Sequence, residues 1–107
     1  NIVAIGCTDE EIASAVNAVI EAQGGISAVI NETIHLLSLP VAGLMSTENG
    51  YAVAEAYTRI DQFSKAVLGS TLTSPFMTLS FMALLVIPHL KLSDKGLFDG
   101  DRFEFIG

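Results

Sequence analysis

The side chains best suited to nucleophilic chemistry are one cysteine and two histidines, Cys7, His35 and His89. Cys7 comes just before an expected helix start, and the N-terminus of a helix can favour a reactive thiolate. A cysteine nucleophile also needs a base, and no spacing in the sequence brings either histidine to Cys7. We therefore expect Cys7 to be a small buried residue, with a nucleophilic role as the less favoured alternative.

The histidines could instead bind a metal ion together with acidic residues near the C-terminus. These acidic residues are Asp94, Asp99, Asp101 and Glu104. A catalytic zinc site needs about three protein ligands, often anchored by a closely spaced pair such as H-x-H or H-E-x-x-H. The two histidines form no such pair, and the late aspartates lie in and beside turns, where aspartate commonly bonds its own backbone. We expect no metal site and no cofactor within this chain.

The segment Gly6–Thr8 precedes an expected helix, and helix N-termini can bind phosphate through free N–H groups. The first helical turn, Asp9–Glu11, is acidic and would repel an anion. The glycine spacing of a dinucleotide-binding turn is also missing. Thr8 and Glu11 instead have the spacing of a capping box, in which each side chain accepts from the other residue's N–H. We predict helix capping here rather than an anion site.

A loop of unusual composition follows Pro40 and contains Gly43, Leu44, Met45 and Ser46. Leucine and methionine side chains in a connecting segment are usually buried against other protein atoms. In the commoner outcome the two side chains pack into the core of their own domain. In the alternative they contact a partner domain or line a substrate pocket, and the sequence leaves both outcomes open.

The charge balance is acidic, with 12 Asp and Glu against 5 Lys and Arg and a formal net charge of −7. Such a field repels phosphate backbones and anionic membranes, so we expect no nucleic-acid partner. The longest apolar run, Phe81–Ile87, is far shorter than the roughly 20 residues that span a bilayer. No basic segment opens a secretory signal. We expect neither membrane insertion nor export.

The single cysteine excludes an intramolecular disulfide and favours a reducing compartment, so we expect the protein to be cytoplasmic. Half of the residues, 50%, are hydrophobic, and the mean hydropathy is +0.54. This apolar content predicts that some surface covers a neighbour as well as the domain's own core. The chain begins at Asn1 rather than at methionine, which agrees equally with a trimmed N-terminus and with a start inside a longer reading frame.

The elements that must position these residues follow from periodicity and from turn residues. Predicted strands cover residues 2–5, 26–30, 34–39, 89–92 and 97–98, and 103–106 is a candidate for a further strand. The strands over 26–30 and 34–39 are expected to pair as a hairpin through residues 31–33, and those over 89–92 and 97–98 through residues 93–96. Predicted helices cover 9–23, 48–68 and 76–85; Gly24–Gly25 should end the first, and Ser74 with Pro75 should open the last. The order β-α-β-β-α-α-β-β predicts one layered α+β domain over residues 1–107, with a mixed or antiparallel sheet and about three helices. The helix over 76–85 is apolar nearly all round, so we expect it to be covered on most sides, with a buried strand as the alternative.

Two longer segments are more specific than these short motifs. Residues 74–99 read SPFMTLSFMALLVIPHLKLSDKGLFD, and residues 39–46 read LPVAGLMS. Both segments resemble the C-terminal domain of bacterial adenine deaminase, a member of the amidohydrolase superfamily. The resemblance also takes in Ile2–Gly6, the helix around Asn17 and the Gln23–Gly25 stop, and so covers nearly the whole chain.

The resemblance implies that this chain is an accessory domain of an enzyme of purine salvage, which hydrolyses adenine to hypoxanthine and ammonia. The chemistry would belong to a (β/α)8 barrel that precedes the domain and holds divalent manganese or iron. The metal-binding H-x-H motif of that barrel has no counterpart here, so no catalytic residue is assigned to this chain. Expected partners are the barrel and further subunits of a homo-oligomer. The expected contact residues are Gly43, Leu44, Met45, Ser46, Phe76, Met77 and His89. A free-standing ligand-binding or dimerisation module is the alternative.

Overall fold

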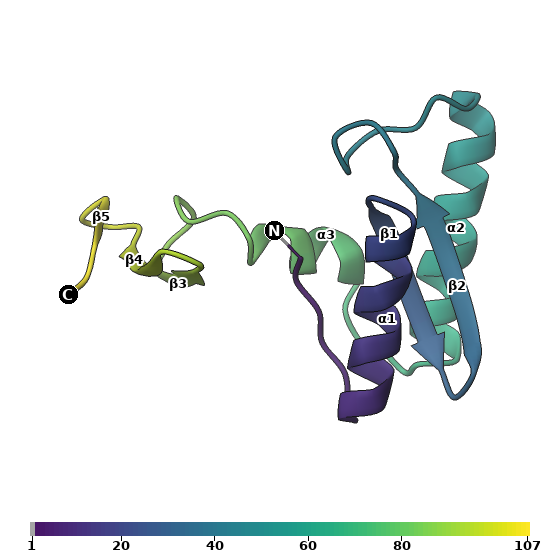
Figure 1. The fold of residues 1–107 in the computed structure, drawn as a ribbon, viewed down its shortest axis with the longest axis horizontal. Coiled ribbons are helices and arrows are strands. Elements are labelled where there is room, and N and C mark those ends of the chain that lie inside the picture. The colour runs from purple at the N-terminus through teal and green to yellow at the C-terminus, as the bar shows by residue number, and fades with distance from the viewer. Residues whose placement is uncertain (1) are drawn as a thin grey trace. The chain divides into compact units, whose positions relative to one another are not determined.

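A computed structural model describes residues 2–107, which form three helices and two antiparallel sheets (Figure 1). The helices are α1 (Asp9–Glu21), α2 (Gly50–Ala66) and α3 (Pro75–Phe81), and the strands are β1 (Gly25–Ile30), β2 (Thr33–Ser38), β3 (Leu90–Ser93), β4 (Gly96–Asp99) and β5 (Glu104–Phe105). The predicted α+β class is confirmed. The chain forms two compact units, Ala4–Pro75 and residues 2–3 with Phe76–Gly107.

Helix α1 begins at a cap that only half matches the predicted capping box. The Thr8 hydroxyl accepts from the Glu11 N–H at 3.2 Å, as expected. The Glu11 carboxylate does not return to the Thr8 N–H. Its Oε1 instead accepts from the Thr8 hydroxyl at 3.2 Å, and its Oε2 accepts from the Asn31 N–H at 3.1 Å. The second half of the prediction was wrong because the carboxylate serves the neighbouring hairpin turn.

The other end of α1 is closed by a pair of backbone hydrogen bonds. The Gln23 N–H bonds to the Ile20 carbonyl at 3.0 Å, and the Gly24 N–H bonds to the Val19 carbonyl at 3.0 Å. This is the bonding of a Schellman motif. Gln23 has a φ of 60°, so the left-handed residue that ends the helix is Gln23 and not the glycine expected from the sequence.

Strands β1 and β2 form the predicted hairpin, with Ile30 opposite Thr33 and a two-residue turn between them. The sequence suggested a longer turn that included Thr33. Asn31 supplies the positive φ that a tight hairpin turn requires, with a value of 52°. Asparagine tolerates this conformation better than most residues, which is why the turn forms without glycine.

The hairpin lies between two helices, one on each face (Figure 1). On one face the Ser27 hydroxyl donates to the Ala15 carbonyl of α1 at 2.8 Å. On the other face the ring of His35 lies 4.0 Å from the ring of Phe63 in α2.

Helix α2 is two residues shorter at each end than predicted, and Asn49 caps it by accepting from the Tyr51 N–H at 2.8 Å. The buried apolar side chains of this unit are Ala28, Val29, Leu37 and Ile60.

The predicted strand over residues 2–5 is not formed. Ile2 and Ile5 are 50% and 83% exposed. The β-branched residues favour an extended backbone, but no strand among residues 2–107 pairs with this segment. An extended segment without a neighbour gains no ladder hydrogen bonds. Propensity alone therefore gave the wrong element here.

Helix α3 begins at Pro75 as predicted but ends at Phe81, four residues earlier than expected. The chain continues in tight turns, in which the Leu84 N–H bonds to the Phe81 carbonyl and the Ile87 N–H to the Leu84 carbonyl, each at 3.2 Å. The expected cover is missing, because Met77 and Phe81 are 51% and 46% exposed. No helix in residues 2–107 is long and apolar enough to cross a membrane.

The C-terminal unit is built on the sheet β3-β4-β5. The predicted hairpin of β3 and β4 is confirmed, and so is a strand within 103–106. Phe98 is 7% exposed and meets the rings of Phe103 and Phe105 edge-on, at centroid distances of 5.4 and 5.1 Å. Phe98 lies opposite Lys91 in the register and both residues are buried, whereas Phe103 and Phe105 are 68% and 48% exposed.

Candidate functional site

Cys7 and His35, two of the residues singled out by the sequence, do not form a reactive site. Cys7 is exposed, so the expectation of a small buried residue was wrong. The strand that would have buried its neighbours is absent. His35 stacks on Phe63 and takes part in packing. No group of three or more His, Cys, Asp or Glu side chains within residues 2–107 is arranged to hold a metal ion.

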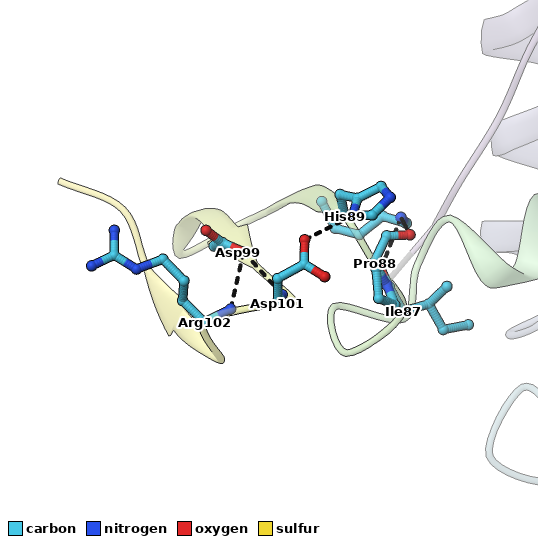
Figure 2. Close-up of polar contacts among 7 residues, drawn as sticks. Ile87, Pro88, His89, Asp99, Asp101 and Arg102 are labelled. Carbon is cyan, nitrogen blue, oxygen red and sulfur yellow. Dashed lines mark hydrogen bonds and ion pairs between the residues drawn. The ribbon is translucent and has the colours of Figure 1, made fainter.

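Of the two histidines, His89 lies in a specific polar arrangement with a carboxylate (Figure 2). Its Nδ1 lies 2.7 Å from Oδ2 of Asp101. The two side chains are 84% and 55% exposed, so the pair faces outwards. A carboxylate on Nδ1 orients the ring and leaves Nε2 as the nitrogen that can meet a further partner. The arrangement can therefore donate or accept a hydrogen bond in a fixed direction.

The segment that carries Asp101 is held by the Asp99 side chain and by one backbone hydrogen bond (Figure 2). Oδ1 of Asp99 accepts from the N–H of Asp101 at 2.9 Å and from the N–H of Arg102 at 3.2 Å. The Gly100 N–H donates to the His89 carbonyl at 2.8 Å. For Asp99 the predicted aspartate turn is confirmed. These bonds bring Asp101 to the histidine, which sequence spacing alone did not reveal.

Lys91 holds the segment ending at His89, residues 87–89, which we call the His89 corner. Lys91 is only 9% exposed, and its Nζ donates to the carbonyls of Ile87 and Pro88 at 3.0 and 3.1 Å. The peptide bond between Pro88 and His89 is cis. A buried ammonium needs such hydrogen bonds, since burying it without them is costly. Sequence analysis missed this role, because a lysine in a strand is ordinarily taken to face solvent.

The burial of Lys91 inverts the usual pattern of strand β3. Side chains alternate between the two faces of a strand, so Leu90 and Leu92 face away from the lysine. They are 52% and 78% exposed. Leu97 lies opposite Leu92 in β4 and is 36% exposed. The result is an exposed apolar face, made of Leu90, Leu92 and Leu97, which we call the leucine face.

The loop Gly43–Ser46 also exposes its apolar side chains. The Val41 N–H and the Met45 carbonyl close the loop at 3.0 Å. Leu44 and Met45 are nevertheless 77% and 57% exposed. The favoured expectation, that they pack into the core of their own unit, was wrong. The loop is tightly closed, with positive φ at Ala42 and Gly43, so its backbone turns the two side chains outwards.

Of the two remaining candidates, Phe76 is partly buried and Met77 is 51% exposed. Both lie at the start of α3, where Ser80 Oγ donates to the Phe76 carbonyl at 2.8 Å. The sequence-predicted contact residues therefore fall at three places in the fold: the 43–46 loop, the start of α3 and the His89 corner.

Comparison with known proteins identifies the family. A family model described as the adenine deaminase C-terminal domain matches residues 1–104. The chain is 59% identical over 106 residues to an adenine deaminase of Sulfurovum sp. (strain NBC37-1) and 58% identical over 106 residues to one of Salinibacter ruber. An adenine deaminase of Methanosarcina barkeri is 54% identical over 108 residues.

These matches cover 99% of this chain but only 19–20% of each relative, so the chain spans about a fifth of their length. No solved structure matches. The resemblance of residues 74–99 and 39–46 to this family is thus confirmed by a match that extends over nearly every residue. The chain belongs to the adenine deaminase C-terminal domain family.

Proposed function

We propose that residues 1–107 act as one accessory domain of an adenine deaminase, which hydrolyses adenine to hypoxanthine and ammonia. The proposal rests on the family match and on relatives of that name, each about five times as long as this chain. The same lengths disfavour the alternative of a free-standing binding module. The role of the domain is to pack on the catalytic part of the enzyme.

The observation that carries this role is the leucine face. Fully burying a leucine contributes about 1.5–3 kcal/mol relative to leaving it exposed. In β3 the lysine takes the buried position while Leu90 and Leu92 are 52% and 78% exposed. Such an inversion is unfavourable in an isolated unit. It becomes favourable when another protein surface covers the leucines.

The 43–46 loop offers a second contact of the same kind. Leu44 and Met45 project from a loop whose backbone is closed by its own hydrogen bonds, and methionine adapts well to an irregular partner surface. The start of α3 adds Phe76 and Met77. His89, oriented by Asp101, supplies a directed polar contact beside apolar ones, as in the core and rim of ordinary interfaces.

The metal of the enzyme belongs outside this chain. The described side chains do not fit a metal site, since no group of three donors comes together in residues 2–107. By family resemblance to the amidohydrolase superfamily, we assign manganese or iron to the catalytic part. There it would supply an activated water for hydrolysis. By the same family resemblance we assign the enzyme to purine salvage and expect a homo-oligomer. The single free Cys7 favours a reducing compartment, so we place the enzyme in the cytoplasm.

The test is release of ammonia from adenine by the full-length protein supplied with manganese or iron. We expect steady turnover, and a metal-loaded protein that releases no ammonia from adenine would disprove the assignment. Met45→Asp places a charge on an exposed apolar contact and should lower the activity or the melting temperature of the full-length enzyme. Thr47→Asp adds the same charge two residues further along and serves as the control. Equal behaviour of the two variants would remove the 43–46 loop from the interface.

A further inference from the structure

Strand β2 has a free edge in the described part of the chain, because its sheet contains only β1 and β2. Backbone groups of an antiparallel strand point alternately towards and away from the neighbouring strand. The Leu39 N–H donates to the Gly24 carbonyl at 3.1 Å. This pair lies one register step beyond the pair Ser38 and Gly25. Counting in steps of two from this bond, the N–H and C=O groups of Leu37 and His35 point towards β1. The N–H and C=O groups of Ile34 and Leu36 therefore point outwards.

This edge lacks the features that usually protect one. Natural edge strands carry charged residues, proline or a bulge, which prevent pairing with a further strand. The sequence of β2, TIHLLS, contains no Lys, Arg, Asp, Glu or Pro, and its register with β1 is continuous. Ile34 and Leu36 are 51% and 44% exposed. The edge thus combines outward hydrogen-bonding groups with exposed apolar side chains.

A groove of about 550 Å³ lies beside the edge, on the face of the hairpin that α1 covers. Ile34 and Leu36 line it from β2, and Asn17, Ala18 and Glu21 line it from α1. The small Ala18 leaves the space open next to the strand. A strand paired to β2 would alternate its side chains, so every second one would point into this groove.

We propose that a β-strand from the catalytic part of the same deaminase chain pairs with the free edge of β2 and fills the groove with apolar side chains. This mode of binding is strand addition, in which main-chain hydrogen bonds supply affinity and pockets for alternate side chains supply specificity. The proposal rests on the proposed function, because that function provides the additional chain. It makes the hairpin one part of a larger sheet.

Two observations favour this occupant over a second copy of the domain. About four-fifths of the length of the relatives lies outside the matched segment. A strand from the same polypeptide can therefore pair with β2 without the loss of translational and rotational freedom that association of two molecules costs. Antiparallel pairing of two β2 strands about a two-fold axis would also set both α1 helices on one face. Helix α1 carries Asp9, Glu10, Glu11 and Glu21 and no basic residue, so the two helices would repel each other.

Amide hydrogen exchange in the full-length enzyme, measured residue by residue, tests the proposal. His35 and Leu37 bond to β1 and give the internal reference. We expect the outward amides of Ile34 and Leu36 to exchange at least about 100-fold more slowly than in an unstructured chain, as amides bonded within a sheet do. Rapid exchange at Ile34 and Leu36, with His35 and Leu37 protected, would overturn the proposal.

A second measurement identifies the occupant. Protection of Ile34 and Leu36 should persist when the enzyme is diluted until light scattering reports a monomer, and its loss on dilution would assign the edge to a second copy and overturn the proposal. Leu36→Lys introduces an edge charge and should speed exchange at Ile34, while His35 and Leu37 stay protected. Unchanged protection of Ile34 in this variant would also count against pairing at this edge. The deaminase assay is a separate measurement. A wild-type protein that is inactive on adenine but protects Ile34 and Leu36 would refute the proposed function and leave strand pairing supported.

Discussion

The carboxylate of Glu11 accepts a hydrogen bond from the backbone N–H of Asn31 over 3.1 Å and so joins the first turn of α1 to the turn of the β1–β2 hairpin. Asn31 is in a left-handed conformation, with a φ of 52°. The same carboxylate accepts from the Thr8 hydroxyl through its other oxygen. One side chain thus fixes both the start of the helix and the position of the hairpin that the helix covers.

Glu11→Ala removes both of these hydrogen bonds. The Thr8 cap on the residue-11 N–H stays, and each hydrogen bond lost from the carboxylate contributes about 0.5–1.5 kcal/mol, so the hairpin turn should open more often. We expect the Asn31 amide to exchange about tenfold faster in the full-length protein, which corresponds to about 1.4 kcal/mol. Glu10→Ala, in the same acidic turn, is the matched control. Equal exchange at Asn31 in the two variants would show that the bond does not hold the turn.

Gly24→Ala should destabilise the protein through the backbone. Gly24 has a φ of 126°, and a Cβ at this position would lie 2.5 Å from the Gly43 Cα and 2.8 Å from the Leu39 carbonyl oxygen. Both obstacles are backbone atoms, so they cannot rotate away. We expect a loss of more than about 1 kcal/mol, measured by chemical denaturation. Gly50→Ala, where a Cβ meets nothing within 4 Å, should be neutral or slightly stabilising.

Lys91→Met tests the buried ammonium. The substitution keeps an unbranched side chain but leaves the carbonyls of Ile87 and Pro88 without their donor. An unsatisfied buried polar group costs about 1–3 kcal/mol, and the cost here should lie near the lower end because Ile87 is half-buried and Pro88 is exposed to water. We expect Lys91→Met to lower the melting temperature. Lys95→Met, in the exposed turn, should leave it unchanged. A stabilised Lys91→Met variant would mean that apolar packing outweighs the two hydrogen bonds.

Leu92→Asp tests whether the leucine face is covered in the full-length enzyme. Leu92 is 78% exposed, so the substitution should change the stability of a bare C-terminal unit by only about 0.5 kcal/mol. Burial of the new charge at an interface would have a much larger effect. We expect a clear fall in the melting temperature of the full-length enzyme, with Leu92→Met close to the wild type. A wild-type melting temperature for Leu92→Asp would place this face in solvent.

The sequence predicted the elements whose local signals agree with their surroundings. Thr8 and Pro75 marked helix starts that the structure confirms, and the hairpins around Asn31 and Gly96 form where turn residues indicated them. Family membership also followed from the sequence, because long segments are specific where short motifs are not.

The failures have a common physical cause, which is the absence of a neighbour that the pattern presupposed. Ile2 and Ile5 were predicted to lie in a strand, but no strand within residues 2–107 pairs with them. Leu44 and Met45 read as core but are exposed, and α3 ends before its apolar sequence does. The pairing of His89 with Asp101 depends on the turn at Asp99, and no spacing rule predicts it.

The position of Lys91 has a consequence for chemical labelling. Amine acylation needs a free and accessible ammonium, and the three lysines differ in this respect. Lys95 lies in an exposed turn, and the side chain of Lys65 is 39% exposed beside Asp61, whereas Lys91 is only 9% exposed. Lys91 should therefore stay unmodified until the C-terminal unit opens. Its acylation rate then reports how often that unit unfolds, with no engineered probe needed.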